Sequence, residues 1–505
     1  MTISPFITHG SDGKELANVA AMIEARTLLQ PVAPALIMKE AIVSYRGLQA
    51  GVNAVAAQLL ESGIRAGQMV GISMGQTPMH MFAMLALARI GAPFVSIHPA
   101  LPGDRRMIAI KRYGVTAIIS GRADCALDGL PFVLLRREDM RPDLPPVPTA
   151  PTESDTPIRI AQSSGTSGDP KGVMLTHGIT RDRFETTAFG MTPKSRVLLM
   201  DLNFVASFNY ALCTLAIGAA IVFVAAETPD DTIDAVRRFA VTDWVTSPAI
   251  VENIAARLSE DDIHFGTLHH LRVVGASPSA KLVDTLFKRF TPNVHVGYGL
   301  TEMGQVAIAT PEMIKREPAT VGPVLAPLEA QIVDEHDNAL PVGQRGILRL
   351  RAPRMLSGYY PDDGLTTDRF RDGWYYPRDL ARLNEDGWLF IEGRQDDVLN
   401  IGGVKVHFRD VERVMEAHPA VKEAAVFVAV SPEGREGMAL AYIAEAVIPA
   451  ASSIELQAYA RAKLGPLCPG QFIAVHDLPR TLTTGKVQRD RLSTLYLDGT
   501  LGAQR

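Results

Sequence analysis

Short apolar runs that suit buried strands alternate with longer, helix-like runs through the first half of the chain. One helix-like run lies between Ser44, a residue type that caps helix N-termini, and Gly63, a residue type that ends helices. Its apolar residues recur every three or four positions, at Leu48, Val52, Val55 and Leu59. This spacing predicts an amphipathic helix with one buried face.

Strand-like runs at 69–73, 93–97 and 115–120 are separated by predicted helices at 78–89 and 105–113. Strands that are joined through helices form parallel sheets with helices on both faces. We therefore expect an α/β fold, a large body of doubly wound sheets in which ligands bind beyond the C-terminal ends of the strands.

The character of the chain changes after about residue 330, where "GILRLRAP" and "GWLFIEGR" look like antiparallel ribbon. The last hundred or so residues mix short helices and strands. A chain of 505 residues is also too long for one ordinary core. We expect a body at 1–395 that includes a small barrel-like subdomain, and a small α+β C-terminal domain at 396–505.

Composition narrows the class of protein. An apolar content of 47% with 21% charged residues is typical of a globular protein. The net charge of −5, without a basic run, gives no sign of nucleic-acid binding. The three cysteines, Cys125, Cys213 and Cys468, are far apart and suit a reducing cytoplasm, and the N-terminus does not look like a signal peptide.

The stretch from Leu202 to Ala226 carries no charge and is long enough to suggest a membrane span. It also contains Asn203, Asn209 and a glycine, Gly218, that precedes a β-rich run. A buried helix that turns through Gly218 into a buried central strand accounts for these residues better. We expect no membrane span.

The loop "SSGTSGDPKGVMLTHG" at 163–178 raises a question about phosphate. Its glycines let the backbone approach a ligand closely, successive N–H groups in such a turn attract anions, and Lys171 adds a positive charge. The spacing does not fit a P-loop, because Lys171 follows Pro170 and the run after it is strand-like. The plain alternative is a surface turn.

Four further segments carry polar residues close to glycines or strand ends. "GYGLTEMG" offers Tyr298 as a flat face and Glu302 as an oxygen ligand for Mg²⁺, unless Thr301 and Glu302 merely begin a helix. "GWYYPRDL" places Asp379 at the end of an aromatic strand, where it could bind a ribose or form a surface salt bridge. The other two are "EGRQDDVLNIGGVKV" and "LPRTLTTGKVQRDRL".

Taken in order, these segments resemble the adenylate-forming superfamily of acyl- and aryl-CoA synthetases, peptide-synthetase adenylation domains and beetle luciferase. The likeness runs from "VSYRGL" near residue 43 to "TGKVQ", and its most specific parts are "SSGTSGDPKG", "YGLTE" and "GRQDDVLNIGG". The resemblance implies ATP-dependent activation of a carboxylic acid to acyl-AMP, release of pyrophosphate and transfer to a thiol, with ATP, Mg²⁺ and CoA taking part.

The resemblance also implies a set of site residues. The β- and γ-phosphates of ATP would be held by Ser163, Ser164, Gly165, Thr166, Ser167, Gly168 and Lys171. The adenine and the α-phosphate would be contacted by Gly275, Ala276, Ser277, Tyr298, Gly299 and Thr301. Glu302 would bind the metal, and Asp379 and Arg394 the ribose.

The remaining implied roles belong to a C-terminal domain that moves. Asp396 matches the hinge about which the small domain turns between two half-reactions. Lys486 would reach the α-phosphate and the substrate carboxylate, while Gly402 and Gly403 would line the approach of the thiol. Few residues follow Lys486, so we expect a separate acceptor, of which free CoA is the common case.

The chain departs from the family pattern at three places, one of which bears on the substrate. Val205 in "FVAS" replaces the aspartate that pairs with an α-ammonium group, so an amino acid is disfavoured. The Pro-x-x-His-x-x-Gly run of many acyl-CoA synthetases is absent, and "PRD" stands for Thr-Gly-Asp. The predicted acyl pocket is apolar without a clear cation, which favours an aryl or alkyl monocarboxylic acid; its wall is Phe204, Ser207, Phe208, Ala249, Val274 and Gly304.

Alternatives remain open at this point. The acyl group could pass to the phosphopantetheine arm of a carrier protein, or the chain could be a non-catalytic nucleotide-binding regulator. The adjacent His269 and His270 could suggest a metal pair, but neighbours on a strand point to opposite faces, so we interpret them as structural. The acid and the oligomeric state, a homodimer among the options, are not fixed by the sequence.

Overall fold

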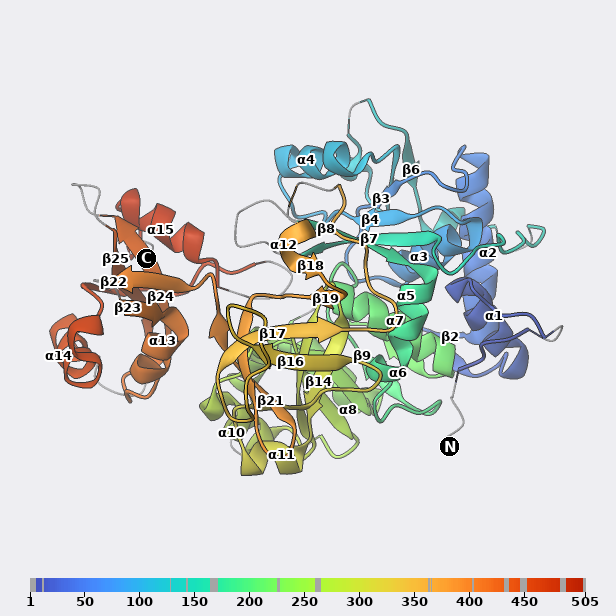
Figure 1. The fold of residues 1–505 in the computed structure, drawn as a ribbon. Coiled ribbons are helices and arrows are strands. Elements are labelled where there is room, and N and C mark those ends of the chain that lie inside the picture. The colour runs from blue at the N-terminus through green and yellow to red at the C-terminus, as the bar shows by residue number, and fades with distance from the viewer. Residues whose placement is uncertain are drawn as a thin grey trace. The chain divides into compact units, whose positions relative to one another are not determined.

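The computed structural model describes most of the chain (Figure 1). The described residues are 6–10, 13–127, 129–141, 144–163, 171–224, 228–258, 265–361, 364, 366–401, 404–430, 436–445, 452–481 and 487–502. They form two compact units, which we describe separately. The first unit comprises Met1–Ser163, Lys171–Glu329 and Arg351–Gly373, and the second comprises Ala330–Leu350 and Trp374–Arg505.

A six-stranded sheet in the first unit has the strand order β6-β5-β3-β4-β7-β8. Neighbouring strands are parallel except for β8, which is antiparallel to β7. The strands are β3 (Val70–Ile72), β4 (Phe94–Ser96), β5 (Ala117–Ser120), β6 (Phe132–Leu134), β7 (Pro157–Ser163) and β8 (Lys171–Thr176). The strand-like runs of the sequence are therefore confirmed, and so is the strand after the glycine-rich loop.

An eight-stranded sheet in the same unit has the order β14-β13-β12-β11-β9-β10-β1-β2. Its six inner strands are parallel, and the edge strands β14 and β2 are antiparallel to their neighbours. The strands are β1 (Pro34–Ile37), β2 (Ile42–Ser44), β9 (Arg196–Leu198), β10 (Ala220–Val222), β11 (Asp243–Thr246), β12 (His270–Val273), β13 (Val294–Leu300) and β14 (Gly304–Ala309).

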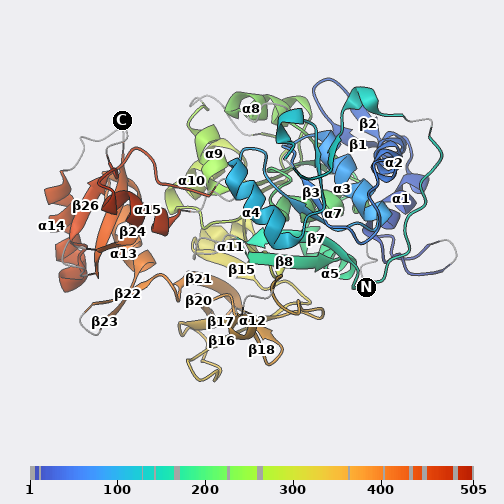
Figure 2. The same ribbon diagram turned by 90° about the horizontal axis from the view of Figure 1, so that it is seen from above.

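Helices cover these sheets. Figure 1 shows α1, α2 and α3 side by side, and Figure 2 shows α8, α9 and α10 grouped together. The helices of the unit are α1 (Val19–Leu29), α2 (Tyr45–Glu61), α3 (Pro78–Ile90), α4 (Gly103–Tyr113), α5 (His177–Asp182), α6 (Phe184–Thr187), α7 (Val205–Ile217), α8 (Pro229–Arg238), α9 (Pro248–Ala255), α10 (Ala280–Arg289), α11 (Pro311–Arg316) and α12 (Thr366–Arg369). Helix α2 begins after Ser44, whose hydroxyl accepts a hydrogen bond from the amide of Gly47 at 3.2 Å. The predicted cap is confirmed.

The uncharged stretch from Leu202 is a buried helix followed by a buried strand. Helix α7 ends at Gly218, which has φ 97, and the chain then enters β10 inside the eight-stranded sheet. Glycine suits this turn because a side chain is disfavoured at such a φ. Within the described parts of the chain, no helix is both long enough and apolar enough to cross a bilayer.

The second unit begins with antiparallel ribbon. Strands β21, β20, β17 and β19 are neighbours in that order, and β16 lies beside β17. Their bounds are β16 (Glu329–Val333), β17 (Gly346–Arg351), β19 (Trp374–Tyr375), β20 (Asp379–Leu383) and β21 (Trp388–Arg394). A hairpin follows, formed by β22 (Val398–Ile401) and β23 (Val404–His407).

The unit ends in a three-stranded sheet with helices on both faces (Figure 1). Alternate residues of β24 point to opposite faces, as its period of two requires. Val426 packs with α13 and α14, whereas Phe427 packs with Leu492 of α15. The elements are β24 (Val421–Val430), β25 (Glu436–Ala444), β26 (Gln471–Ala474), α13 (Phe408–Glu416), α14 (Ser453–Leu464) and α15 (Arg489–Leu497). The predicted fold class is confirmed, and a domain boundary near residue 395 stays a prediction.

Candidate active site

The predicted nucleotide and acyl residues of the first unit follow adjacent strands. Phe204 comes after β9, Ala249 after β11 and Gly275 after β12, while Tyr298 lies near the end of β13. Because these parallel strands are neighbours, their C-terminal ends meet at one edge of the sheet. Gly275 has φ 91, and a Cβ built on it would lie 3.9 Å from Cζ of Phe204. The sheet thus brings adenine-site and acyl-site candidates together.

Glu302 lies in the tight turn between β13 and β14. These strands are antiparallel neighbours, so the alternative in which Thr301 and Glu302 begin a helix is wrong. Glu302 is only 7% exposed. Gln305 fixes the strands around the turn, because its Nε2 donates to the carbonyl of Tyr298 at 3.1 Å and to that of Ala307 at 2.7 Å.

Tyr359 links Glu302 to the glycine-rich loop. Its hydroxyl donates to Oε1 of Glu302 at 2.9 Å, and Nζ of Lys171 lies 5.3 Å from the centre of its ring. The next residue, Tyr360, donates its amide to the carbonyl of Gly172 at 2.8 Å. A Cβ on Gly172 would lie 2.2 Å from the Tyr360 carbonyl oxygen, so only glycine fits there. Tyr359 thereby brings Lys171 and Glu302, which the sequence assigned to separate loops, near one another.

Arg183 supports the Glu302 turn from the other side. Its Nη2 donates to the carbonyl oxygen of Glu302 at 2.7 Å, and a Cβ on Gly304 would lie 2.9 Å from its Cδ. Burial lowers the pKa of Arg183 to about 10, although Glu302 counteracts the shift. A buried cation therefore contacts Gly304, one of the residues of the predicted acyl wall, and sequence reasoning did not anticipate it.

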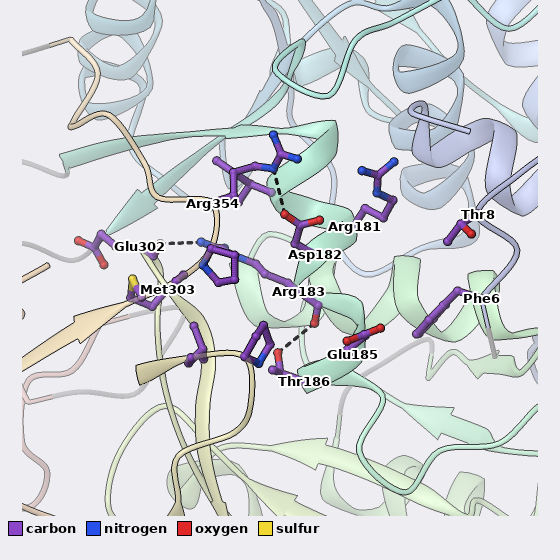
Figure 3. Close-up of a pocket in the computed structure, with 15 residues that line it drawn as sticks. Phe6, Thr8, Arg181, Asp182, Arg183, Glu185, Thr186, Glu302, Met303 and Arg354 are labelled. Atoms are coloured by element: carbon purple, nitrogen blue, oxygen red, sulfur yellow. Dashed lines mark hydrogen bonds and ion pairs between the residues drawn. The ribbon is translucent and has the colours of Figure 1, made fainter. Parts of the chain in front are cut away.

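A cleft of about 350 Å³ runs along the backbone of Glu302 and Met303. Figure 3 shows Arg183 reaching the backbone of Glu302, while Arg354 forms an ion pair with Asp182 at 2.9 Å. The carboxylate of Glu302 points away from the ion pair of Arg354 and Asp182 (Figure 3). None of the six residues of the predicted acyl wall lines this cleft. It is therefore distinct from the acyl pocket that the sequence predicts.

Two residues of the predicted acyl wall are completely buried. Ser207 and Phe208 have no exposed surface in α7. The ring of Phe208 packs edge-on against Phe94, and the guanidinium of Arg159 lies 4.7 Å from its centre. Phe208 thus packs α7 against β4 and β7 of the six-stranded sheet through cation–π and aromatic contacts. Its role in an acyl pocket stays a prediction.

The predicted ribose pair lies in the second unit. The aromatic strand β19 ends at Tyr375, so Asp379 does not end that strand but begins β20. Asp379 and Arg394 are cross-strand partners of β20 and β21, with Oδ1 and Nη1 3.9 Å apart. Asp396 lies beside them, because its Oδ2 is 3.8 Å from Nη2 of Arg394. The structure therefore brings these three predicted residues together.

Several predicted residues cannot be placed. Those outside the described residues are Ser164, Gly165, Thr166, Ser167, Gly168, Gly402, Gly403 and Lys486. Ser163 ends β7 opposite Lys171.

His270 is structural, as the sequence indicated. Its Nδ1 is 2.9 Å from Oδ1 of Asp243, which is also 3.1 Å from Nη1 of Arg272. Burial alone raises the pKa of Asp243, but the hydrogen bond with His270 and the charge of Arg272 outweigh it and lower the pKa to about 2. The described residues contain no group of three or more His, Cys, Asp or Glu side chains that could hold a metal.

Mg²⁺ nevertheless fits Glu302. This ion often takes one or two carboxylates from the protein and completes its coordination with phosphates and water. Tyr359 occupies one site of Oε1, and an ionised carboxylate has further lone pairs. A single buried carboxylate therefore suits a metal that arrives with a nucleotide.

Comparison with known proteins identifies the family. A model described as AMP-binding enzyme matches residues 23–360, and one described as AMP-binding enzyme C-terminal domain matches residues 410–486. The chain belongs to the AMP-binding enzyme family. The resemblance inferred from the loop sequences is confirmed.

The relatives of this AMP-binding enzyme fall into two kinds. The 3-hydroxybenzoate–CoA ligase of an Aromatoleum species is 29% identical, over 96% of this chain and 98% of its own length. Tyrocidine synthase 3 of Brevibacillus parabrevis is 25% identical over 94% of this chain, which spans only 8% of that protein. Among solved structures, o-succinylbenzoate CoA synthetase of Bacillus subtilis, in complex with its acyl-adenylate intermediate, has a TM-score of 0.82 and 21% identity, over 93% of this chain and 97% of that one. This last likeness supports the fold.

Proposed function

We propose that the protein activates a monocarboxylic acid with an apolar aryl or alkyl tail to acyl-AMP and then transfers the acyl group to the thiol of CoA. The observation that carries this proposal is the buried Glu302, bonded to Tyr359 beside Lys171, in a chain of the AMP-binding enzyme family. A carboxylate and a lysine close together suit a metal-bound triphosphate.

The first half-reaction forms the anhydride. An oxygen of the substrate carboxylate attacks the α-phosphorus of ATP, and the bond to the β-phosphate oxygen breaks with its electron pair, so that pyrophosphate leaves. Like charges oppose this attack, and catalysis therefore consists of neutralising charge and aligning the attacking and leaving oxygens. Mg²⁺ would supply positive charge at the phosphate oxygens.

The residues of this chain divide the work. Lys171 and the glycine-rich loop would hold the departing pyrophosphate, and Glu302 would hold Mg²⁺. Asp379 and Arg394 bind the ribose hydroxyls, and Gly275–Ser277 with Tyr298 frame the adenine. Lys486 reaches the attacking carboxylate and the α-phosphate. In the second half-reaction the thiol sulfur attacks the acyl carbon, and AMP leaves on its phosphate oxygen, with Gly402 and Gly403 beside the thiol.

The choice of substrate follows from burial costs. Val205 begins α7 and is 9% exposed, so an α-ammonium group there would lack a carboxylate partner. An unpaired buried ammonium is costly. This supports an acid without an α-amino group. Arg183 is engaged with the carbonyl of Glu302 and therefore does not by itself require a second carboxylate on the substrate.

A carrier protein is the alternative acceptor. The 25% identity with tyrocidine synthase 3 favours considering it, since the same adenylate could pass to a phosphopantetheine thiol. A non-catalytic regulator is less well supported, because a nucleotide-binding protein does not need Lys486, Glu302 and Asp379 together.

A pyrophosphate-release screen tests the proposal. Purified protein with ATP and Mg²⁺ is offered benzoates, cinnamates, short and long fatty acids and amino acids, with and without CoA, and products are identified by mass spectrometry. We expect acyl-CoA from an aryl or alkyl acid. Pyrophosphate without acyl-CoA, together with loading of a carrier protein, would favour the alternative acceptor. No acid-dependent pyrophosphate at all would leave only nucleotide binding.

A further inference from the structure

Arg378 has a backbone conformation that most side chains avoid. Its φ is 64, in the left-handed region, and it immediately precedes β20. Glycine adopts this conformation without cost, whereas a residue with a Cβ is disfavoured there. An arginine at such a position suggests that its side chain has a role that outweighs the backbone preference.

The side chain of Arg378 binds Asp396. Nη1 of Arg378 forms an ion pair with Oδ1 of Asp396, and Nη2 of Arg394 lies 3.8 Å from the other carboxylate oxygen. The backbone adds a third contact, because the amide of Gln395 donates to the carbonyl of Arg378 at 2.7 Å. Asp396 is therefore held by the segment around β20 and β21.

The backbone amide of the next residue, Asp397, still donates to the carbonyl of Arg394 at 3.3 Å, but its carboxylate binds a different set of elements. Its Oδ2 lies 3.2 Å from Nη1 of Arg489, the first residue of α15. Nη2 of Arg489 contacts Glu412 of α13 at 2.7 Å, and its Nε donates to the carbonyl of Val426 in β24 at 3.1 Å. Glu412 is only 3% exposed, so this group belongs to the interior of the C-terminal part, which is the sheet of β24, β25 and β26 with α13, α14 and α15.

The side chains of two consecutive residues are thus bound to different elements: Asp396 to the segment around β20 and β21, and Asp397 to α15 of the C-terminal part. We propose that Arg378 is a positioning residue that fixes the side chain of Asp396 to the ribbon, so that turning of the C-terminal part is confined to the backbone torsions of Asp396 and Asp397. The proposal rests on the proposed function, in which that part turns between two half-reactions. Arg489 holds Asp397 to the part that turns.

The pair should matter most where two orientations are needed. Pyrophosphate exchange uses one orientation, whereas complete turnover uses two and the passage between them. Without the ion pair between Arg378 and Asp396, the C-terminal part reaches each defined orientation less often. The pair is partly exposed, with 40% of the Arg378 side chain and 25% of the Asp396 side chain accessible, so the effect is modest and sensitive to salt.

Three variants separate the side chain from the backbone. Arg378→Gly suits the left-handed φ but loses the charge, Arg378→Lys keeps a charge, and Arg413→Ala removes a comparably exposed arginine of α13 as a control. We measure the ratio of complete turnover to acid-dependent pyrophosphate exchange. We expect Arg378→Gly to lower the ratio about three-fold, the size of a half-exposed ion pair, with an unchanged or raised Tm. Arg378→Lys should restore most of it.

Salt gives a second criterion. Raising NaCl from about 0.05 M to about 0.5 M should lower the ratio of the wild-type protein towards that of Arg378→Gly and change the variant little. An unchanged ratio in Arg378→Gly, or a lysine variant as impaired as the glycine variant, would overturn the proposal.

Hydrogen exchange distinguishes this failure from failure of the proposed function. Amides at 395–398 should exchange about three-fold faster in Arg378→Gly than in the wild-type protein and the Arg413→Ala control, whether or not any acid is activated. Unchanged exchange there would overturn the proposal even if the enzyme is active. Absence of activity with faster exchange would contradict only the proposed reaction.

Discussion

The two units hold their predicted site residues in different ways. In the first unit, Glu302 is buried in a tight turn, with hydrogen bonds to its side chain from Tyr359 and to its backbone from Arg183. In the second unit, the partly exposed Arg394 lies between two carboxylates at the end of a ribbon, the buried Asp379 and the partly exposed Asp396. Buried polar networks rigidify, whereas exposed ion pairs contribute little stability and exchange partners easily. The buried arrangement around Glu302 suits a fixed phosphate and metal site, and the partly exposed arrangement around Asp396 suits a hinge.

The largest effect is expected when the positive charge of Lys486 is removed. Lys486→Ala should reduce acid-dependent ATP–pyrophosphate exchange about a hundred-fold or more, because positive charge at the reacting oxygens is lost. Acyl transfer from supplied acyl-AMP should remain largely intact. Lys463→Ala in α14 serves as the control. Equal loss of both half-reactions would contradict a role confined to adenylation.

The stability of the first unit should fall in acid, because the unit contains a buried histidine, His177. His177 has no exposed surface, its Nδ1 accepts a hydrogen bond from the amide of Val19 at 3.2 Å, and burial lowers its pKa to about 4. The unfolded state therefore binds a proton more readily, and stability is lost as the pH falls from about 6.5, with the loss complete below about 4. For a shift of this size the cost reaches about 3 kcal/mol.

Denaturant unfolding at several pH values measures this cost. His177→Gln should make the free energy of unfolding less dependent on pH between about 6.5 and 4. His336→Gln changes an exposed turn residue and is the control. An identical pH dependence in His177→Gln and the wild-type protein would mean that His177 is not held neutral.

A smaller effect is expected at Tyr359. Tyr359→Phe removes the hydroxyl that donates to Glu302, which leaves a buried carboxylate short of one donor. We expect the free energy of unfolding to fall by about 1–2 kcal/mol and pyrophosphate exchange to fall about ten-fold, with a higher Mg²⁺ requirement. Tyr45→Phe is a matched control, since that buried hydroxyl donates to the carbonyls of Leu215 and Ala219. A Tyr359 variant that loses stability like the control but keeps full exchange would remove Tyr359 from the site.

The smallest effect is expected at Asp396, the predicted hinge. Proline fixes φ and restricts the preceding residue, so Asp396→Pro should stiffen the backbone there. We expect complete turnover to fall several-fold more than pyrophosphate exchange, as measured by the ratio of the two rates. Unchanged turnover would argue against alternation of the C-terminal part and would weaken the contrast between the two units.

Much of the fold could be predicted from local patterns. The helix after Ser44, the strand after the glycine-rich loop and the buried helix that ends at Gly218 follow from spacing, capping and glycine preferences. The meeting of the loops after β9, β11, β12 and β13 follows once the strands are parallel neighbours. These features depend on residues close in sequence or on general rules of sheet architecture.

The partners of the site residues could not be predicted. Tyr359 reaches Glu302 across 57 positions of sequence and Arg183 reaches it across 119, and no local pattern marks either residue. The left-handed φ of Arg378 was equally hidden, because only glycine at such a position gives a sequence signal. The helix alternative at Thr301 arose because acidic residues often begin helices, whereas antiparallel pairing of β13 with β14 decided the turn.

Acid-dependent ATP–pyrophosphate exchange in the absence of any thiol tests the central claim most directly, because it reports bond making and breaking at the α-phosphorus alone. With labelled pyrophosphate and a broad panel of acids, the account predicts exchange with at least one aryl or alkyl monocarboxylic acid and almost none in Lys486→Ala. Protein that is folded and binds ATP, yet gives no exchange with any acid of the panel, would contradict it.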